Sequence, residues 1–290
     1  MDLRWKLHQT LYFLRASVSR ALGRFLRTSG LAPGLRDAFE RVERAVVGDT
    51  KPIRIAGSVV SFKRLDEGVT FTDYTQKERR VIKDILATCT PETTFFDIGA
   101  NYGMYTCLVA DVAGSDNVVA FEPHAGNTTL IRENLSINDL QATVVHAAVG
   151  DSDGTVDFAL QTETAGATHN MALPDGPAAT TSTMDTVVEV EMTTLDSYVE
   201  EESCPVPEIV KIDVEGAEYG VIDGARETLE HDDCRLVYCE VHPRHLPDYG
   251  HDADAVESAL VDLGFEVEVV HKERQQDKSD EAYFLRAIKP

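Results

Sequence analysis

The 290-residue sequence predicts an α/β protein built on a doubly wound, mostly parallel sheet of the Rossmann-like type. Three observations lead to this fold class. From residue 93 onward, short apolar runs rich in β-prone residues alternate with segments of helical periodicity. The run at 94–98 passes through two glycines directly into a helix, which is typical of a cofactor-binding turn. Two closing strands, at 266–270 and 282–287, are expected to end the chain as an antiparallel pair.

The individual elements follow in a regular order. Before the sheet we expect a helix at 36–47, a hairpin at 53–62 and an amphipathic helix at 75–86 that Asp73 could cap. Strands are expected at 94–98, 117–122, 142–148, 155–160, 187–193, 207–213, 236–241, 266–270 and 282–287. Helices are expected at 103–113, 127–138, 216–229 and 253–263, with a short helix capped by Thr194 or Asp196. Residues 161–185 indicate a long loop, of the kind that often closes over a ligand.

These elements divide the chain into three parts. Residues 1–50 form a basic helical extension, residues 51–92 a hairpin and a helix, and residues 93–290 the core domain. Residues 1–30 hold six basic side chains and one acidic side chain, a net charge of +5, so residues 31–290 carry −28. Drawn as a helix, residues 1–30 have one continuous apolar stripe. Either this helix makes a peripheral contact with a membrane surface, or it packs on the acidic body or on a second subunit.

The composition is strongly acidic, with 50 Asp and Glu against 27 Lys and Arg and a net charge of −23. Nucleic-acid binding depends on Lys and Arg that neutralise phosphates, so we predict no nucleic-acid partner. Such acidity suits high salt, where charge repulsion is screened, and we interpret the protein as halophilic; an ordinary acidic cytosolic protein is the alternative. The five cysteines show no zinc-ligand spacing, and no run of about 20 apolar residues could span a membrane. We therefore expect a cytoplasmic protein and leave its oligomeric state open.

The stretch TTFFDIGANYGMYT, residues 93–106, is the first candidate site. Its strand ends near Asp97 and continues through Gly99 and Gly103 into a helix. Such a turn presents free backbone N–H groups, and glycine lets a ligand approach closely. An acid two residues before the first glycine suits a cationic ligand such as S-adenosylmethionine better than a pyrophosphate. Glu122, at the end of the next strand, lies at the ~20-residue offset where an acid bonds ribose hydroxyls. A helix cap for Asp97 and a solvated position for Glu122 are the alternatives.

The segment KIDVEGAE, residues 211–218, is the second candidate site. Ligands bind beyond the carboxyl ends of parallel strands, and the next strand ends in a Glu-Val-His sequence. Two neighbouring strand ends would thus bring several charged side chains to one crevice: Lys211, Asp213, Glu215, Glu240 and His242. Methyl transfer to oxygen requires a base for the hydroxyl proton, and histidine has a suitable ordinary pKa, with Asp213 or Glu215 as substitutes. Ion-paired and capping acids are the structural alternative. Carboxylates alone do not establish a divalent cation, and we predict no metal.

Residues 93–240, about half of the chain, resemble the FkbM family of methyltransferases; the first ~90 residues and the loop at 161–185 lie outside the resemblance. The blocks that carry the resemblance are FDIGANYGMYT, VVAFEPHAGNTTLIRENLSIN, AAVGDSDGTVDF, TTLDSY and KIDVEGAEYGVIDGA, in that order. The resemblance implies a class I methyltransferase fold that uses S-adenosylmethionine to methylate a hydroxyl on a sugar or similar ring. It assigns cofactor binding to Asp97, Gly99, Asn101, Gly103 and Glu122, with Ala100, Thr106 and Pro123 from the same blocks. His124 departs from the Asn that commonly follows the Glu-Pro pair.

We therefore predict an O-methyltransferase with a sugar or glycan acceptor, which a lipid could carry. A nicotinamide-dependent oxidoreductase is one alternative, since it would explain the glycine turn and Glu122. It would explain neither Asp97 nor the KIDVEGAE block. A non-catalytic cofactor-binding subunit is the other alternative, but it gives no reason to gather acids and a histidine. The sequence names neither the acceptor nor the position that is methylated.

Overall fold

The computed structural model describes residues 48–64, 78–160, 170–173, 186–270 and 282–290, with single positions between 6 and 45. The chain divides into two compact units, residues 1–54 with 59–64 and residues 55–58 with 65–290. The predicted amphipathic helix at 1–30 lies outside the described residues except at Lys6 and Thr10, which are helical. The described positions of the expected helix at 36–47 are helical too. The three domain boundaries and the membrane contact stay predictions.

Strands β1 (Thr50–Ile55) and β2 (Ser58–Lys63) form a two-stranded sheet. They are joined by a two-residue turn in which φ is positive at both positions, 50° at Ala56 and 98° at Gly57. Turns of this kind match the twist of the flanking strands, which is why they predominate in tight hairpins. The hairpin predicted at 53–62 is confirmed.

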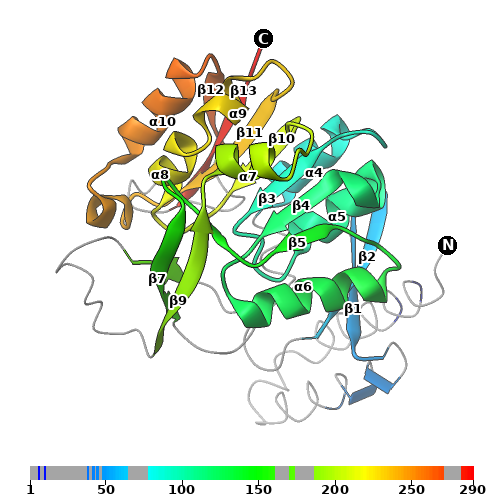
Figure 1. Ribbon diagram of the computed structural model, residues 1–290. Helices are drawn as coiled ribbons and strands as arrows, with labels where there is room; N and C mark the ends of the chain where they lie inside the picture. The colour runs from blue at the N-terminus through cyan, green and yellow to red at the C-terminus, as the bar shows by residue number, and fades with distance from the viewer. Residues whose placement is uncertain are drawn as a thin grey trace, which may run out of the picture. The chain divides into compact units, whose positions relative to one another are not determined.

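A seven-stranded sheet forms the centre of the second unit (Figure 1). Its strand order is β12-β13-β11-β10-β3-β4-β5, and only β13 runs antiparallel to its neighbours. This confirms the predicted α/β class and the C-terminal antiparallel pair. The strands are β3 (Phe95–Ile98), β4 (Val118–Phe121), β5 (Thr143–Val145), β10 (Ile209–Ile212), β11 (Leu236–Val241), β12 (Glu266–Val270) and β13 (Tyr283–Ile288).

Helices cover both faces of this sheet (Figure 1). Phe96 and Ile98 of β3 face one core cluster, which includes residues of α7 (Leu195–Glu201), α8 (Glu218–Asp223), α9 (Arg226–Glu230) and α10 (Ala253–Asp262). Side chains alternate along a strand, so Phe95 and Asp97 face the other side. There α5 (Met104–Ala113) packs on β3 and β4 and contacts α4 (Arg79–Thr88) and α6 (Ala125–Ile137). Burying each large apolar side chain contributes about 1.5–3 kcal/mol, so the two layers hold β3 firmly in place.

A second, four-stranded sheet has the order β6-β9-β7-β8. Its strands are β6 (Ala148–Val149), β7 (Gly154–Leu160), β8 (Met171–Ala172) and β9 (Thr186–Thr193). The strand predicted at 142–148 was wrong as a single element, because the chain bends at Ala147 and divides it between the two sheets as β5 and β6. Strand β8 lies inside the predicted loop at 161–185, whose other residues are mostly outside the described part.

The helix predicted at 216–229 was also wrong as a single element. The structure has α8 and α9 instead, separated at Gly224. A Cβ on Gly224 would lie 2.0 Å from the carbonyl oxygen of Gly150, so the chain passes against the loop after β6 at this point. The close approach, which is not visible from local periodicity, ends the first helix. The Thr194 cap of α7 is confirmed, since its hydroxyl accepts a hydrogen bond from the Ser197 N–H at 3.0 Å.

Candidate functional site

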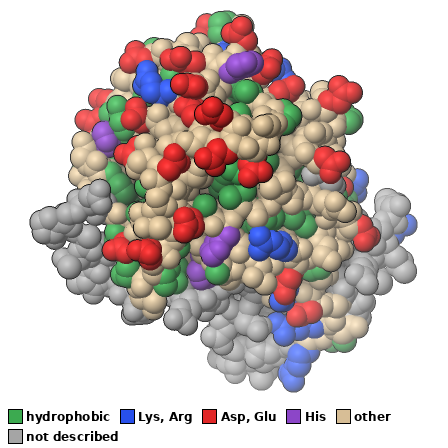
Figure 2. Space-filling model, viewed as in Figure 1, with side chains coloured by type: hydrophobic (Ala, Val, Ile, Leu, Met, Phe, Trp, Pro, Cys, Tyr) green, Lys and Arg blue, Asp and Glu red, His purple; other side chains and the backbone are tan. Residues whose placement is uncertain are grey.

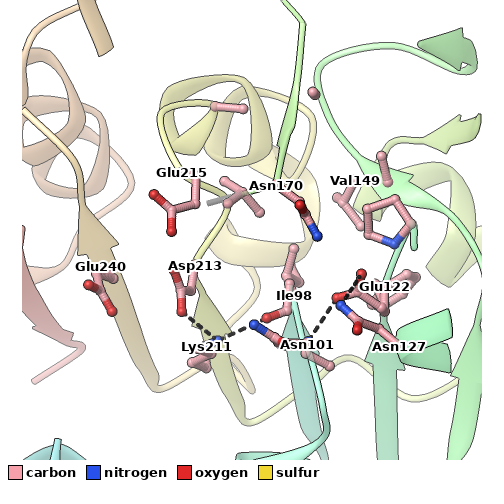
Figure 3. A pocket seen from close by; sticks show the side chains of 18 of the residues that line it. Ile98, Asn101, Glu122, Asn127, Val149, Asn170, Lys211, Asp213, Glu215 and Glu240 are labelled. Carbon is pink, nitrogen blue, oxygen red and sulfur yellow. Dashed lines mark hydrogen bonds and ion pairs between the residues drawn. The ribbon is translucent and has the colours of Figure 1, made fainter. Parts of the chain in front are cut away.

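A cavity of about 320 Å³ lies at the carboxyl ends of the central strands. Pockets for small ligands and cofactors begin at about this size. Figure 3 shows its two sides: Glu122, Asn127 and Val149 lie on one side, and Asp213, Glu215 and Glu240 on the other, with Lys211 and Asn101 between them. We call the first side the turn half and the second the acidic half. The sequence placed both candidate sites at strand ends, and the structure brings them into one cavity.

The glycine turn forms the floor of the turn half. Both glycines have positive φ, 75° at Gly99 and 81° at Gly103, and Asn101 between them has φ of 52°. At Gly99 the requirement is also steric, because a Cβ there would lie 1.9 Å from the backbone carbonyl oxygen of Asp213. Gly99 therefore permits the close approach of the chain after β10, whereas the sequence had suggested the approach of a ligand.

The backbone N–H groups of this turn are used within the protein. The N–H groups of Gly99 and Ala100 both donate to the Phe121 carbonyl at 3.0 Å, and Gly103 donates to Ala100 at 2.8 Å. The Asn101 N–H donates to Glu122 Oε2 at 2.8 Å. The expectation of free N–H groups at these positions was wrong, because the end of the neighbouring strand β4 supplies the acceptors for residues 99–101 and Ala100 supplies the acceptor for Gly103. Without free N–H groups these positions offer no cradle for a pyrophosphate.

Asp97 lies beneath the turn, with its side chain fully buried. Its Oδ2 accepts hydrogen bonds from the Thr106 N–H at 3.0 Å and the Thr106 hydroxyl at 2.6 Å. Its Oδ1 lies 3.6 Å from Lys211 Nζ. Asp97, Gly103 and Thr106 do not line the cavity, whereas the other predicted cofactor residues do, namely Gly99, Ala100, Asn101, Glu122 and Pro123. Instead of meeting a ligand directly, Asp97 ties the turn to α5 and to β10.

Glu122 lines the cavity from the end of β4 and is only 4% exposed. Besides Asn101, its donors are the His124 N–H at 2.9 Å and the Asn127 side-chain amide at 3.2 Å, both to Oε1. Burial raises the pKa of this carboxyl to about 7, although the three hydrogen bonds and the charge of Lys211 act in the opposite direction. A carboxylate can accept about four hydrogen bonds, so one acceptor position remains beyond these three.

Lys211 stands at the boundary between the two halves. Its Nζ donates to the Gly99 carbonyl at 3.2 Å and lies 3.2 Å from Asp213 Oδ2. Burial alone would lower the pKa of this ammonium, but the surrounding carboxylates, Asp213 and Asp97 first, raise it above its ordinary value. Lys211 is therefore a fixed positive charge at neutral pH. It holds the carboxylates of β10 and β3 together and is unsuited to accept a proton.

His242 lies at the centre of the acidic half, where its side chain is 9% exposed. Its Nδ1 lies 2.7 Å from Glu218 Oε1, and its Nε2 faces single oxygens of Glu215 at 3.5 Å, Glu240 at 3.6 Å and Asp213 at 3.9 Å. Burial would lower the pKa of the imidazole, but the hydrogen bond to Glu218 and the charges of Glu240, Glu218 and Glu215 raise it to about 10. The expectation that His242 is the base rested on its ordinary pKa, and it does not hold in this environment.

Glu218 is a residue of the site that the sequence analysis missed. Its side chain is fully buried, and Oε1 also accepts from the Gly216 N–H at 2.8 Å. Oε2 accepts no hydrogen bond from the part of the chain that the structure describes. Glu218 closes the KIDVEGAE block, and an acid in the first turn of a helix was a signal that could have identified it. It was passed over because caps and ion pairs explain most such acids.

A further wall of the cavity comes from the second sheet. Phe158 of β7 and Asn170 and Ala172 around β8 line the cavity. The hydroxyl of Tyr249, in the short helix η3 (Leu246–Tyr249), donates to the Ala172 carbonyl and so connects this wall to the region after β11. None of these residues was predicted as part of the site: Asn170 and Ala172 come from the irregular segment 161–185, and the strand predicted at 155–160 gave no sign that Phe158 reaches the cavity.

The charge of the cavity is unbalanced. Its lining includes Glu78, Glu122, Asp213, Glu215 and Glu240 against Lys211 and His242. Acidic side chains are also more numerous than basic ones on the face of the molecule shown in Figure 2. Near the turn half the lining is less polar, with Phe121 and residues 147–149 beside Glu122. The cavity thus combines a partly apolar slot with a polar, negatively charged end.

Comparison with known proteins gives a consistent result. Residues 97–267, more than half of the chain, match the profile of the methyltransferase FkbM domain. The chain is 26% identical over 200 residues, or 69% of its length, to the hexuronic acid methyltransferase AglP of Haloferax volcanii, and the match covers 74% of that protein.

Two solved structures are among those that match this chain. The FkbM methyltransferase of Methylobacillus flagellatus gives a TM-score of 0.46 at 15% identity; the match covers 71% of this chain but only 46% of that one. A precorrin-6y C5,15-methyltransferase of Geobacter metallireducens gives 0.45 at 15% identity, covering 79% and 94%. Within the described residues, no helix has both the length and the apolar character needed to cross a bilayer.

Proposed function

Because the chain belongs to the FkbM methyltransferase family, we propose that it is an S-adenosylmethionine-dependent O-methyltransferase that acts on a sugar hydroxyl. The observation that carries the proposal is the single cavity in which the turn half, with Glu122, meets the acidic half. One end has the features of a nucleoside site and the other has proton acceptors, as transfer between two bound molecules requires.

The turn half fits the proposed cofactor. Glu122 would accept a hydrogen bond from a ribose hydroxyl, and the less polar surface of residues 147–149 would take the adenine ring. Gly99, Ala100, Asn101 and Pro123 would complete the contact surface, with Asp97 and Thr106 supporting the turn from below. When bound, S-adenosylmethionine supplies an electrophilic methyl group on a positively charged sulfur. The negative charge of the cavity favours such a cation.

The same turn argues against the nicotinamide alternative. Dinucleotide sites bind the pyrophosphate through free N–H groups at the start of a helix. Here the N–H groups of Gly99, Ala100, Asn101 and Gly103 are already bonded within the protein. A pyrophosphate would also lie in a cavity whose lining is mostly acidic among its charged residues. Both observations support a cofactor without phosphates.

The acidic half supplies the proton chemistry in this proposal. An alcohol is barely ionised near neutral pH, so the hydroxyl proton must be removed as the oxygen forms its new bond to carbon. The oxygen's electron pair makes the C–O bond, the C–S electron pair stays on sulfur, and the proton passes to a protein carboxylate. Lys211 is positively charged, and so is His242 when no cation is bound to it, so neither can accept this proton. Asp213, Glu215 and Glu240 line the cavity and are the candidate acceptors.

A sugar is the acceptor class suggested by the name of one relative. The Haloferax volcanii relative is named for hexuronic acid, and carboxylate side chains with several oxygens in reach suit a ligand with many hydroxyl donors. We extend the proposal to sugars with or without a carboxyl group. Acceptor attachment to a lipid and contact of residues 1–30 with a membrane remain expectations from the sequence.

The test is direct methyl transfer. The full chain is incubated with methyl-labelled S-adenosylmethionine and either a glucuronoside or the matching glucoside. The proposal expects label in the sugar and a product heavier by one CH₂ group. Binding is measured in parallel by calorimetry with S-adenosylmethionine and with NAD. Binding of NAD alone would support the oxidoreductase, and binding of S-adenosylmethionine without transfer to any hydroxylated acceptor would support a non-catalytic subunit.

A further inference from the structure

We propose that Asp213, Glu240 and His242 form a binding site for one divalent metal cation at the acidic end of the cavity. This departs from the expectation of no metal that the sequence alone supported. The three residues come from two neighbouring strands: Asp213 directly follows β10, Glu240 belongs to β11 and His242 directly follows it. The use of the cation in catalysis rests on the proposed function, whereas its binding does not.

The geometry suits one ion. A carboxylate oxygen from Asp213, one from Glu240 and a ring nitrogen of His242 all lie within 4.8 Å of one another. His242 Nε2 lies 3.6 Å from Glu240 Oε1 and 3.9 Å from Asp213 Oδ1. Metal–ligand bonds of about 2.0–2.2 Å place two ligand atoms about 3–4 Å apart around one ion. The distances from Nε2 already fall in this range.

A second observation, independent of the carboxylates, is the orientation of the imidazole. The His242 side chain is about nine-tenths buried, and Nδ1 is held by Glu218 at 2.7 Å. No described residue makes a hydrogen bond to Nε2, which instead points at the carboxylates. A metal-bound histidine almost always gives its other ring N–H to a carboxylate or carbonyl, which fixes the ring and its tautomer. Glu218 and His242 have this arrangement, and a cation that binds Nε2 would displace the proton from this nitrogen.

The electrostatics point in the same direction. Four carboxylates surround one imidazole: Asp213, Glu215, Glu218 and Glu240. Glu218 and Glu240 are 0% and 3% exposed, so water screens their charges poorly. The nearest fixed cation, Lys211, already lies beside Asp97 and Asp213. A divalent cation would offset part of the negative charge that these carboxylates place where water screens it poorly.

Such an ion would give the acidic half a way to hold the acceptor. Asp213, Glu240 and His242 all line the cavity, so open coordination positions would face it. A sugar hydroxyl bound there would lose its proton more readily, because the cation stabilises the developing alkoxide. The proton would pass to Glu215, whose Oε2 lies 3.5 Å from His242 Nε2 and which is not one of the three ligands. A carboxylated sugar, otherwise repelled by these acids, could bind through the cation.

Manganese binding tests the site without any turnover. The full chain is titrated with Mn²⁺ in about 1 M KCl, which screens diffuse binding to the acidic surface, and free Mn²⁺ is followed by its EPR signal. We expect one ion per chain, with affinity reduced at least tenfold in Asp213→Asn and in Glu240→Gln. Glu191→Gln, an exposed change of the same kind on β9, is the matched control and should bind like the wild type.

The outcomes separate cleanly. No Mn²⁺ bound by the wild type, or equal binding by all four proteins, would overturn the proposal. Circular dichroism checks that each variant is folded; if Glu240→Gln is not, the wild-type stoichiometry and Asp213→Asn still decide. Failure of methyl transfer with intact Mn²⁺ binding would count against the proposed function alone. If methyl transfer continues at the full rate after a chelator has removed the ion, the cation site would exist but would have no role in catalysis.

Discussion

The two halves of the cavity are built from neighbouring strands yet satisfy their polar groups in opposite ways. In the turn half, the N–H groups of residues 99–101 and the Glu122 carboxylate bond to each other and to the end of β4 at 2.8–3.0 Å. In the acidic half, the closest approaches of His242 Nε2 to carboxylates are 3.5–3.9 Å, too long for good hydrogen bonds. The turn half is thus held by short internal hydrogen bonds, whereas the charges around His242 Nε2 are held by longer contacts.

This difference separates the roles that the two halves can play. A turn that is rigid before binding loses little entropy when its cofactor arrives, which favours affinity. An acidic cluster held together by Lys211 carries stored electrostatic energy that a bound cation or a reacting group can release. Changes in the acidic half should therefore alter turnover, and changes in the turn half should alter affinity and stability.

The largest effect is expected from Glu215→Gln. If Glu215 takes the hydroxyl proton, its loss should lower turnover on the true acceptor by ~10²–10⁴-fold, because the amide cannot act as a base. The affinity for S-adenosylmethionine should stay close to the wild-type value. Single-turnover methyl transfer and calorimetry measure the two quantities, with Glu191→Gln as the matched surface control. Full turnover by Glu215→Gln would show that Glu215 is not the base and that another carboxylate accepts the proton.

Asp97→Ala is expected to destabilise the fold by about 3–5 kcal/mol, because it leaves the buried Lys211 ammonium without one of its partners. It also removes both hydrogen bonds to Thr106. Urea unfolding measures the change. Asp111→Ala is the control. This exposed position lies on α5, the helix that carries Thr106, and the variant should stay within ~0.5 kcal/mol of the wild type. If Asp97→Ala loses no more stability than Asp111→Ala but binds the cofactor more weakly, Asp97 would have to be a direct cofactor ligand.

A pH effect is expected at Glu122, whose folded-state pKa is raised to about 7. A ribose hydroxyl donates to the ionised carboxylate, so affinity for S-adenosylmethionine should fall up to tenfold per pH unit below about 7. Glu122→Gln should bind about tenfold more weakly above pH 7 and lose this dependence. Calorimetry across this range tests both. A wild-type affinity that is flat with pH would remove the ribose contact from Glu122.

The same raised pKa has an opposite consequence for the protein without ligand. The folded state binds this proton more tightly than the unfolded state, in which the carboxyl has its ordinary pKa near 4.5. Stability from this group is therefore greatest below that pH and decreases as the pH rises toward about 7. The difference between wild type and Glu122→Gln in unfolding free energy, measured on both sides of this range, isolates the contribution.

The smallest effect is expected from salt. Residues 31–290 carry a net charge of −28, and their mutual repulsion opposes the folded state. The Debye length is ~30 Å at 0.01 M salt and ~3 Å at 1 M, so this repulsion should be much weaker at the higher concentration. The thermal midpoint should rise by several degrees between these salt concentrations, as about 1 kcal/mol would produce. Cofactor affinity per folded molecule should change less, since the turn half is held by short internal hydrogen bonds. A midpoint that does not rise would contradict the halophilic interpretation.

The sequence predicted the parts of the fold and site that depend on local pattern. The strand, glycine turn and helix at 94–113 and the strand ends carrying Asp213 and His242 are of this kind. Their gathering at one edge follows from the general geometry of parallel sheets. All five residues assigned to the second site line the cavity as a result. Their catalytic roles stay predictions.

Contacts between distant segments were the part that could not be predicted. The N–H groups of Gly99 and Ala100 donate to the Phe121 carbonyl on another strand, and Gly224 lies against the Gly150 carbonyl. The burial of Asp97 is different, because the period of two along β3 places it on the same side as Phe95. The alternation along the strand therefore already indicated that Asp97 is buried. The prediction of a cofactor ligand followed instead from its position two residues before Gly99.

The wall contributed by the second sheet has a consequence for enzyme engineering. Phe158 of β7, Ala172 of β8 and Asn170, which directly precedes β8, line the cavity; among the described residues, β7 and β8 pair with each other and belong to the four-stranded sheet. Substitutions there change the shape of the space in front of the cluster without altering the strands that carry it. A library restricted to these three positions should therefore yield variants with altered sugar preference while each retains the parental scaffold.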